Sequence, residues 1–136
     1  MMKQKFTKLL DLYKGYSGEP GYFFAAADKE NNFHYYLRVW EGFVYNIFNE
    51  PHVVNEKVLG FTKVFLDYDL FNDFNHGLDN FYKIEDKKEV LDDAIWYKTN
   101  RTYEGKTLAF LGALIELVQY AIDNNLDLLV ANDQDI

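Results

Sequence analysis

The chain contains no cysteine, and this absence removes three kinds of site at once. Disulfide bridges, zinc centres with thiolate ligands and cysteine nucleophiles all require the missing thiol. Serine is almost as scarce, because Ser17 is the only one and stands in a glycine-rich stretch. It lacks the G-x-S-x-G frame of a serine hydrolase. Catalysis through sulfur is therefore excluded, and the usual signature of catalysis through serine is missing.

Long apolar runs and positive charge are also lacking. No stretch approaches the ~18 consecutive apolar residues of a membrane-spanning helix. The first residues, MMKQKFTKLLDLYKG, lack the continuous apolar core and the cleavage site of a secretory signal. Lys and Arg number 14 against 22 Asp and Glu, and the resulting charge of −8 repels nucleic-acid phosphate. We therefore expect a cytoplasmic protein that binds neither membranes nor nucleic acid.

Patterns for metals, cofactors and phosphates fail as well. Carboxylates and a histidine gather between 67 and 79, but counting a calcium loop from Asp67 puts Asn72 where glycine is needed and Leu78 where glutamate is needed. The three histidines share no motif, and the glycines between 15 and 21 lack the Lys-Ser/Thr pair of a phosphate-binding loop. We expect no metal, no cofactor and no catalytic residue. Hydrolysis by two carboxylates stays open, because any acidic domain offers such pairs.

What the chain does have is length for one core and many aromatic rings. Its 136 residues predict a single domain over 1–136. Phe, Tyr and Trp make up 18% of the sequence. Most such rings are expected in the core, and an exposed aromatic binding face is the alternative.

Hydrophobic periodicity predicts an antiparallel meander over 22–48. The run 22–27 is apolar, a polar turn follows, and residues 33–40 alternate between two faces. A turn at 41–42 leads into 43–48, which we expect to be the third strand. The region from 52 to 82 has no clear period, although 61–66 resembles a strand.

The strongest helix signal covers about 107–124, where apolar positions surround most of the helix and Leu114 and Ile115 stand in its middle. Such a helix must be buried on several sides. Shorter helices are expected at 3–14 and 86–95, and a strand at 96–103. The run 126–131 is either a last strand or a docked extension. The predicted fold is α+β, an antiparallel sheet packed against the long C-terminal helix with shorter helices on the same face.

The acid excess lies entirely in the second half of the chain. Residues 1–66 carry eight Lys and Arg against seven Asp and Glu, whereas residues 67–136 carry six against fifteen. Folding does not explain this segregation of charge, because like charges in one segment repel each other. A partner of opposite charge would explain it. Between 67 and 82 the acids alternate with rings, which fits both a solvated surface with its rings turned inward and a contact face, where the rings would anchor a partner and the acids would steer it. The residues expected to bind the partner are Asp67, Tyr68, Asp69, Phe71, Asp73, Phe74 and Asp79.

In this character the chain resembles the small immunity proteins of bacterial toxin systems, including contact-dependent growth inhibition. The resemblance lies in the acidic segment FLDYDLFNDFNHGLDNFYKIEDKKEVLDD and the buried-type helix TLAFLGALIELVQYAIDN. It implies a non-catalytic inhibitor that binds a cognate toxin domain, basic and nuclease-like, and occludes its active or substrate-binding surface. The acids at 67–79 would then occupy the place of nucleic-acid phosphates.

A rival interpretation is a small-ligand-binding protein or an enzyme. Its pocket would lie on the sheet, lined by Tyr35, Tyr36, Trp40 and Trp96 beside Arg38. A third is an adaptor whose aromatic surface forms a homo-oligomer. The sequence leaves the oligomeric state open.

Overall fold

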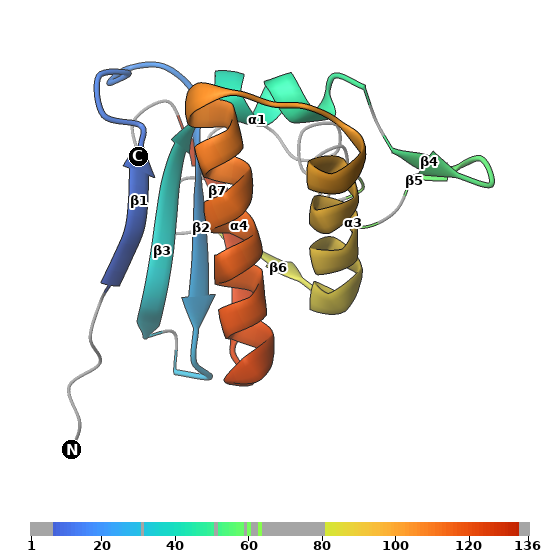
Figure 1. Cartoon of the computed structure of the whole chain (residues 1–136). Helices are drawn as coiled ribbons and strands as arrows, with labels where there is room; N and C mark the ends of the chain where they lie inside the picture. The colour runs from blue at the N-terminus through green and yellow to red at the C-terminus, as the bar shows by residue number, and fades with distance from the viewer. Residues whose placement is uncertain are drawn as a thin grey trace.

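A computed structural model describes residues 7–30, 32–50, 52–58, 60, 63 and 81–133. Across these residues the chain forms a five-stranded mixed sheet with three helices, an α+β fold (Figure 1). The strands of this sheet are β1 (Thr7–Leu12), β2 (Gly21–Ala27), β3 (Phe33–Trp40), β6 (Tyr82–Ile84) and β7 (Asp127–Asp133). The helices are α1 (Glu41–Phe48), α3 (Lys87–Asn100) and α4 (Gly105–Asp123).

The strand order is β1-β3-β2-β7-β6, and the sheet is mixed because its outer strand β1 runs parallel to β3. The other neighbours, β2 with β3, β2 with β7 and β6 with β7, are antiparallel. The expected pairing of 22–27 with 33–40 is confirmed, as is a last strand near 126–131. The purely antiparallel meander over 22–48 is wrong, because its third member is a helix and a parallel strand lies beside β3.

Helix α1 replaces the expected strand at 43–48 for a reason visible in its burial. Val44, Ile47 and Phe48 are buried, whereas Tyr45 is 55% exposed. Positions 44 and 47 face opposite sides of a strand but one side of a helix, so a helix buries both against a single surface. Gly42 lets the ring of Trp40 lie against the first turn, since a Cβ at 42 would stand 2.2 Å from that ring.

Strand β1 replaces the expected helix at 3–14. A short isolated helix is marginal in water, since nucleation is costly and few hydrogen bonds follow it. Residues 7–12 gain ladder partners beside β3 instead, in a register that runs from Thr7 with Tyr35 to Leu12 with Val39 and shifts once between Lys8 and Leu10. Leu12 and Tyr13, consecutive in the chain, are both buried.

Helix α4 covers one face of the sheet, and α3 packs beside α4 (Figure 1). The helix expected at 86–95 runs on to Asn100, so the strand expected at 96–103 is wrong. Asp86 caps α3 by accepting the Glu89 N–H at 2.9 Å. The long C-terminal helix is confirmed as α4, which contacts β1, β2, β3 and β7 as well as α1 and α3. In Figure 1 it lies along the sheet, with α3 beside it.

The core lies between α4 and the sheet. Tyr22, Phe24 and Leu37 meet Phe110 and Leu114 there, all at most 2% exposed. By length and composition α4 is also apolar enough to cross a membrane. Its buried positions pack on the sheet, however, which is typical of the core helix of a soluble protein.

The opposite face of the sheet carries a second group of rings. Phe23 on β2 stacks with Tyr36 on β3, with ring centroids 5.2 Å apart. Phe33 and Phe81 contact Phe23 and meet each other edge to face at 5.3 Å. β2 is therefore buried along its whole length, as its unbroken apolar run requires.

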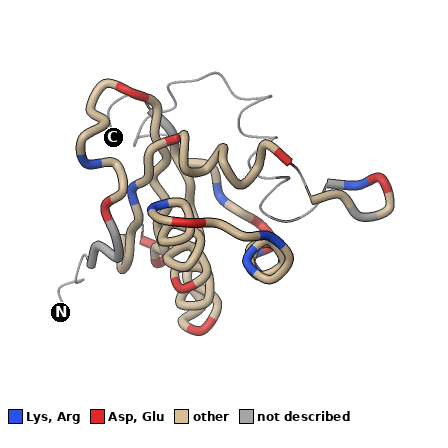
Figure 2. Tube along the Cα trace, turned by 45° about the horizontal axis from the view of Figure 1, so that its top comes forward, with Lys and Arg blue, Asp and Glu red and all other residues tan. Residues whose placement is uncertain are grey.

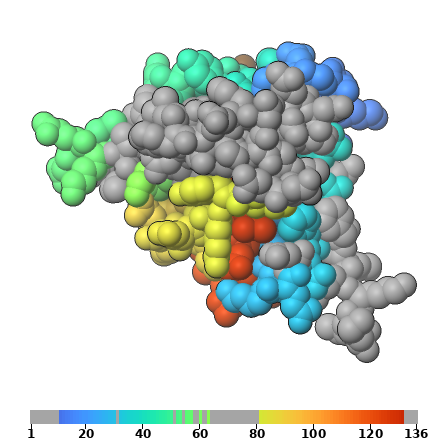
Figure 3. All heavy atoms as spheres, turned by 180° about the vertical axis from the view of Figure 1, so that it is seen from behind, coloured from blue at the N-terminus to red at the C-terminus, as the bar shows by residue number. Residues whose placement is uncertain are grey.

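A small hairpin projects from this body on the side of α3. It joins β4 (Val53–Val54) to β5 (Lys57–Val58). Asn55 and Glu56 both have positive φ, which a two-residue hairpin turn of type I′ requires. Figure 3 shows the hairpin standing away from the rest of the chain, as Figure 1 does from the other side. His52 immediately precedes it and ties its base to α3.

Candidate site: an acidic groove beside helix α3

An open groove of about 510 Å³ runs along α3 beside His52. Its volume falls within the ~300–1,000 Å³ usual for ligand sites. The residues that line it are His52, Asp86, Lys88, Glu89, Asp92, Asp93 and Trp96. Four carboxylates against one ammonium group give it a formal charge of −3 when His52 is neutral.

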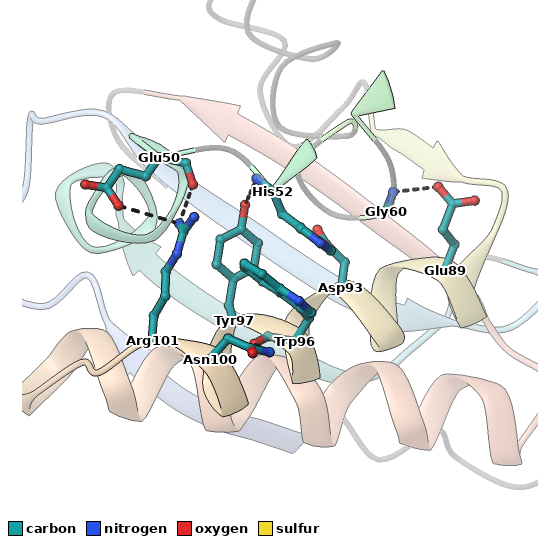
Figure 4. Close-up of polar contacts among 9 residues, drawn as sticks. All are labelled: Glu50, His52, Gly60, Glu89, Asp93, Trp96, Tyr97, Asn100 and Arg101. Atoms are coloured by element: carbon teal, nitrogen blue, oxygen red, sulfur yellow. Dashed lines mark hydrogen bonds and ion pairs between the residues drawn. The ribbon is translucent and has the colours of Figure 1, made fainter. Parts of the chain in front are cut away.

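His52 and Asp93 form the central polar contact of the groove. The Nδ1 atom of His52 lies 2.7 Å from Oδ1 of Asp93 (Figure 4). The Asp93 side chain is only 4% exposed and that of His52 is 19% exposed. A buried carboxylate is costly without a partner, so this contact stabilises both the charge and the position of the segment before the hairpin.

Aromatic residues of α3 fix the orientation of His52. Its imidazole stacks on the indole of Trp96, with centroids 3.7 Å apart and planes 7° from parallel. Its backbone N–H donates to the Tyr97 hydroxyl at 2.6 Å. Arg101 lies over the rings of Trp96 and Tyr97, at 5.2 and 5.1 Å, and donates to the Glu50 carbonyl (Figure 4). The chain after α1 is thus held to α3 at residues 50 and 52.

The other three carboxylates of the groove each use one oxygen. Asp86 Oδ1 accepts the Glu89 N–H, and Glu89 Oε1 accepts the Gly60 N–H. Asp92 Oδ1 pairs with the Lys88 ammonium at 2.7 Å, an exposed pair of the i,i+4 type. Among the described residues the second oxygen of each has no partner.

A smaller polar cavity of about 350 Å³ lies at the other end of α3, between Asn46, Glu50, Arg101 and Tyr103. The Tyr103 hydroxyl is buried and has no hydrogen-bond partner in the part of the chain that the structure describes. Burial raises the pKa of this hydroxyl, and the neighbouring Arg101 opposes the rise. Glu50 accepts a hydrogen bond from Arg101 through its carbonyl, and its carboxylate lies 4.0 Å from the same guanidinium, so the positive charge in this cavity faces a negative one.

Figure 2 shows acidic positions along α4, around α3 and at the tip of the hairpin, with basic positions between them. Residues 81–133 carry ten Asp and Glu against six Lys and Arg. The acid excess of the second half thus extends into the described residues. The residues expected to bind the partner, Asp67, Tyr68, Asp69, Phe71, Asp73, Phe74 and Asp79, lie outside them.

The residues of the rival aromatic pocket are not brought together. Tyr35 meets Tyr120 of α4, whereas its neighbour Tyr36 points to the other face of the sheet and stacks on Phe23. Trp40 stacks on Tyr16, and Arg38 lies over Tyr13. Trp96 stacks on His52, away from the sheet. Strand alternation alone separates Tyr35 from Tyr36, a signal already present in the sequence.

The sequence did not predict the groove. His52 lies 41 residues from Asp93, and the segment between them has no readable period. The one available signal was the spacing of Asp86, Glu89, Asp93 and Trp96, which a helix reaching to residue 100 places on one face. Because the sequence pattern predicts a strand at 96–103, it does not place Trp96 on the same helix as the three acids.

Comparisons of the chain with protein-family models, with curated proteins and with solved structures gave no match.

Proposed function

We propose that this chain is a non-catalytic inhibitor that binds another protein, an immunity protein of the kind found in contact-dependent growth inhibition. Its partner is a cognate toxin domain with a basic, nuclease-like surface, and inhibition is by occlusion of the active or substrate-binding surface. The inhibitor acts in the cytoplasm. The observation that carries the proposal is the acidic groove beside α3, whose four carboxylates outweigh a single lysine.

Two physical arguments connect this groove to a basic partner. Complementary charge steers encounter and raises the association rate, more than it raises affinity. The charge of residues 81–133 has the same sign as that of the groove, so the wider surface reinforces the attraction. The acidic, aromatic segment 67–79 remains a sequence prediction for a second part of the same interface.

The rival function, ligand binding or catalysis in an aromatic pocket on the sheet, has less support, because the rings named for that pocket contact different neighbours. The observation that favours an enzyme instead is the contact between His52 and Asp93. The described lining of the groove includes no hydroxyl side chain beside it. We assign this pair the positional role of holding residue 52 to α3.

The test is capture from the native host with this chain as bait, at ~50 mM and ~500 mM salt, which bracket weak and strong screening. We expect a basic protein domain that is retained at low salt and weakened at high salt. Its activity in isolation must be abolished by a stoichiometric amount of this chain. Capture of nothing, of the chain itself or of a partner indifferent to salt would contradict the proposal.

A triple variant tests the segment predicted from sequence. Neutralising Asp67, Asp69 and Asp73 to asparagine should leave the fold intact and slow association at low salt. Unchanged association kinetics would show that 67–79 is not part of the interface. The proposal that the groove binds the partner would not be affected.

A further inference from the structure

We propose that the groove beside α3 binds an arginine side chain of the partner. The proposal rests on the function proposed above and names the contact through which it would act. The planar guanidinium would bind the carboxylates of α3, and the aliphatic stem would lie on the rings of His52 and Trp96.

The first argument is the uncommitted acceptor capacity of the groove. Asp86, Glu89 and Asp92 each have one oxygen engaged and one without a partner among the described residues. An ionised carboxylate accepts at about four lone-pair positions, so each keeps room for a donor. A guanidinium offers five N–H donors in a fixed fork, which is the complement of several carboxylate oxygens.

The second argument is the buried charge at the end of the groove. Asp93 lines the groove although its side chain is only 4% exposed, and His52 is one partner that the structure places against it. In such a poorly hydrated position a further positive charge interacts more strongly than at an exposed surface. The exposed pair of Lys88 and Asp92 competes little, because pairs of that kind contribute ~0.3–0.5 kcal/mol.

The third argument is the shape and chemistry of the wall. Asp86, Glu89 and Asp93 follow one another on one face of α3 over about 10 Å, given the helical rise of 1.5 Å per residue. The stacked rings of His52 and Trp96 continue this face as an apolar surface. Arginine stems cover such surfaces while the charged head reaches the polar groups.

Arginine is favoured over lysine by the same features. An ammonium is a compact, strongly hydrated point charge, whereas a guanidinium stacks on rings and bridges two carboxylates. The protein already places one guanidinium against this end of α3, since Arg101 lies 5.2 Å from the centre of the Trp96 ring.

The experiment follows the indole N–H signals of the full chain by nuclear magnetic resonance. Trp96 and Trp40 are the two tryptophans, and a Trp40→Phe variant assigns their signals. The probes are the capped tripeptides Gly-Arg-Gly, Gly-Lys-Gly and Gly-citrulline-Gly at ~20 mM salt, where screening is weak. We expect the arginine peptide to shift the Trp96 signal, not the Trp40 signal, and to bind at least about threefold more tightly than the other two, a difference of ~0.65 kcal/mol.

Matched variants decide which carboxylates act. The groove variant combines Asp86→Asn, Glu89→Gln and Asp92→Asn, which preserve the cap and the Gly60 contact because an amide oxygen still accepts. The control combines Glu104→Gln, Glu116→Gln and Asp123→Asn, three exposed positions on or beside α4 with the same change in net charge. The groove variant should abolish the shift and the control should retain it. Equal binding of citrulline, an equal shift of Trp40, or equal loss in both variants would overturn the inference.

The two proposals fail in different ways. If the native partner is captured as well by the groove variant as by the control, the arginine contact is wrong and the inhibitor function stands. If the arginine peptide binds the groove but no basic partner is captured, the contact stands and the inhibitor function is wrong.

Discussion

The imidazole of His52 is held between a buried carboxylate and an indole. Its Nδ1 atom lies 2.7 Å from Asp93 Oδ1, and its ring stacks 3.7 Å from the centre of Trp96. Because Asp93 and Trp96 belong to one helix and His52 to a distant loop, these two contacts fasten the base of the projecting hairpin to α3. Stability and the proposed binding site therefore share the same side chains.

Replacing His52 by phenylalanine should destabilise the protein by about 1–3 kcal/mol, the range for losing a hydrogen bond to a buried charged group. The ring is kept, so the loss reports the contact with Asp93 and not the stacking on Trp96. Urea unfolding measures the change in the free energy of unfolding. Adding Asp93→Asn to the variant should recover part of the loss, because a neutral amide is less costly to bury than a carboxylate.

The matched control is His34→Phe. His34 also faces an aspartate, Asp28, but at 3.4 Å and with both side chains about a quarter exposed. The His34→Phe variant should lose no more than about 0.5 kcal/mol in its free energy of unfolding. Equal losses in the two variants would show that the buried contact at His52 contributes no more to stability than the more exposed contact at His34.

The sequence predicted those elements whose hydrophobic pattern is compatible with only one kind of secondary structure. The apolar run of β2 and the long helix α4 are recovered, because each is apolar on more sides than a surface element can be. The segment 43–48 was assigned to a strand because a six-residue apolar run fits both periods. Only its packing, with Val44 and Ile47 buried on one side, distinguishes them.

The parallel strand β1 was missed for a related reason. Residues 7–12 have helical spacing, and their pairing with β3 is a long-range contact that no local pattern encodes. The groove was missed because its two sides, residue 52 and helix α3, are joined only by tertiary structure. The acid excess of residues 67–136 is a property of the sequence, but the sequence does not predict that four of these carboxylates line a groove beside His52.

Truncation of Leu114 tests whether α4 organises the core. Leu114 is fully buried, whereas its neighbour Ile115 is only partly buried at the edge of the core. Leu114→Ala should therefore cost about 2–5 kcal/mol, the range for large core truncations, and Ile115→Ala clearly less. Chemical denaturation of both variants gives the comparison. A loss below ~1 kcal/mol for Leu114→Ala, as at an ordinary surface site, would show that α4 is not central.

Two helical glycines should respond to alanine with opposite signs. A Cβ at Gly42 would stand 2.2 Å from the Trp40 ring, which is itself stacked on Tyr16. Gly42→Ala should cost about 1–3 kcal/mol, because the ring must leave that stack. Gly112, inside α4, has open space where the Cβ would be, so Gly112→Ala should stabilise by ~0.5–1 kcal/mol. Thermal unfolding of the pair checks the signs. A gain for Gly42→Ala would contradict the close approach of Trp40, and a loss for Gly112→Ala would contradict the open space in α4.

The turn between β2 and β3 should make stability depend on pH below the ordinary carboxyl range. Asp28 Oδ1 accepts the N–H groups of Asn32 and Glu30, and the bond from Asn32 contributes most to lowering the Asp28 pKa below its ordinary 3.8. A lowered folded-state pKa means that the unfolded chain binds more protons in this window. The stability from this group is therefore complete above 3.8 and lost as the pH falls through the folded-state pKa.

Asp28→Asn removes that titration while its amide oxygen still accepts in the turn. The difference in unfolding free energy between the wild type and this variant should be constant near pH ~6 and should shrink at pH values below ~4. Urea unfolding across this range measures it. Asp123→Asn, on the exposed side of α4, controls for the removal of a carboxylate as such. If both variants change the pH dependence equally, the effect belongs to net charge, and the turn of Asp28 has no part in it.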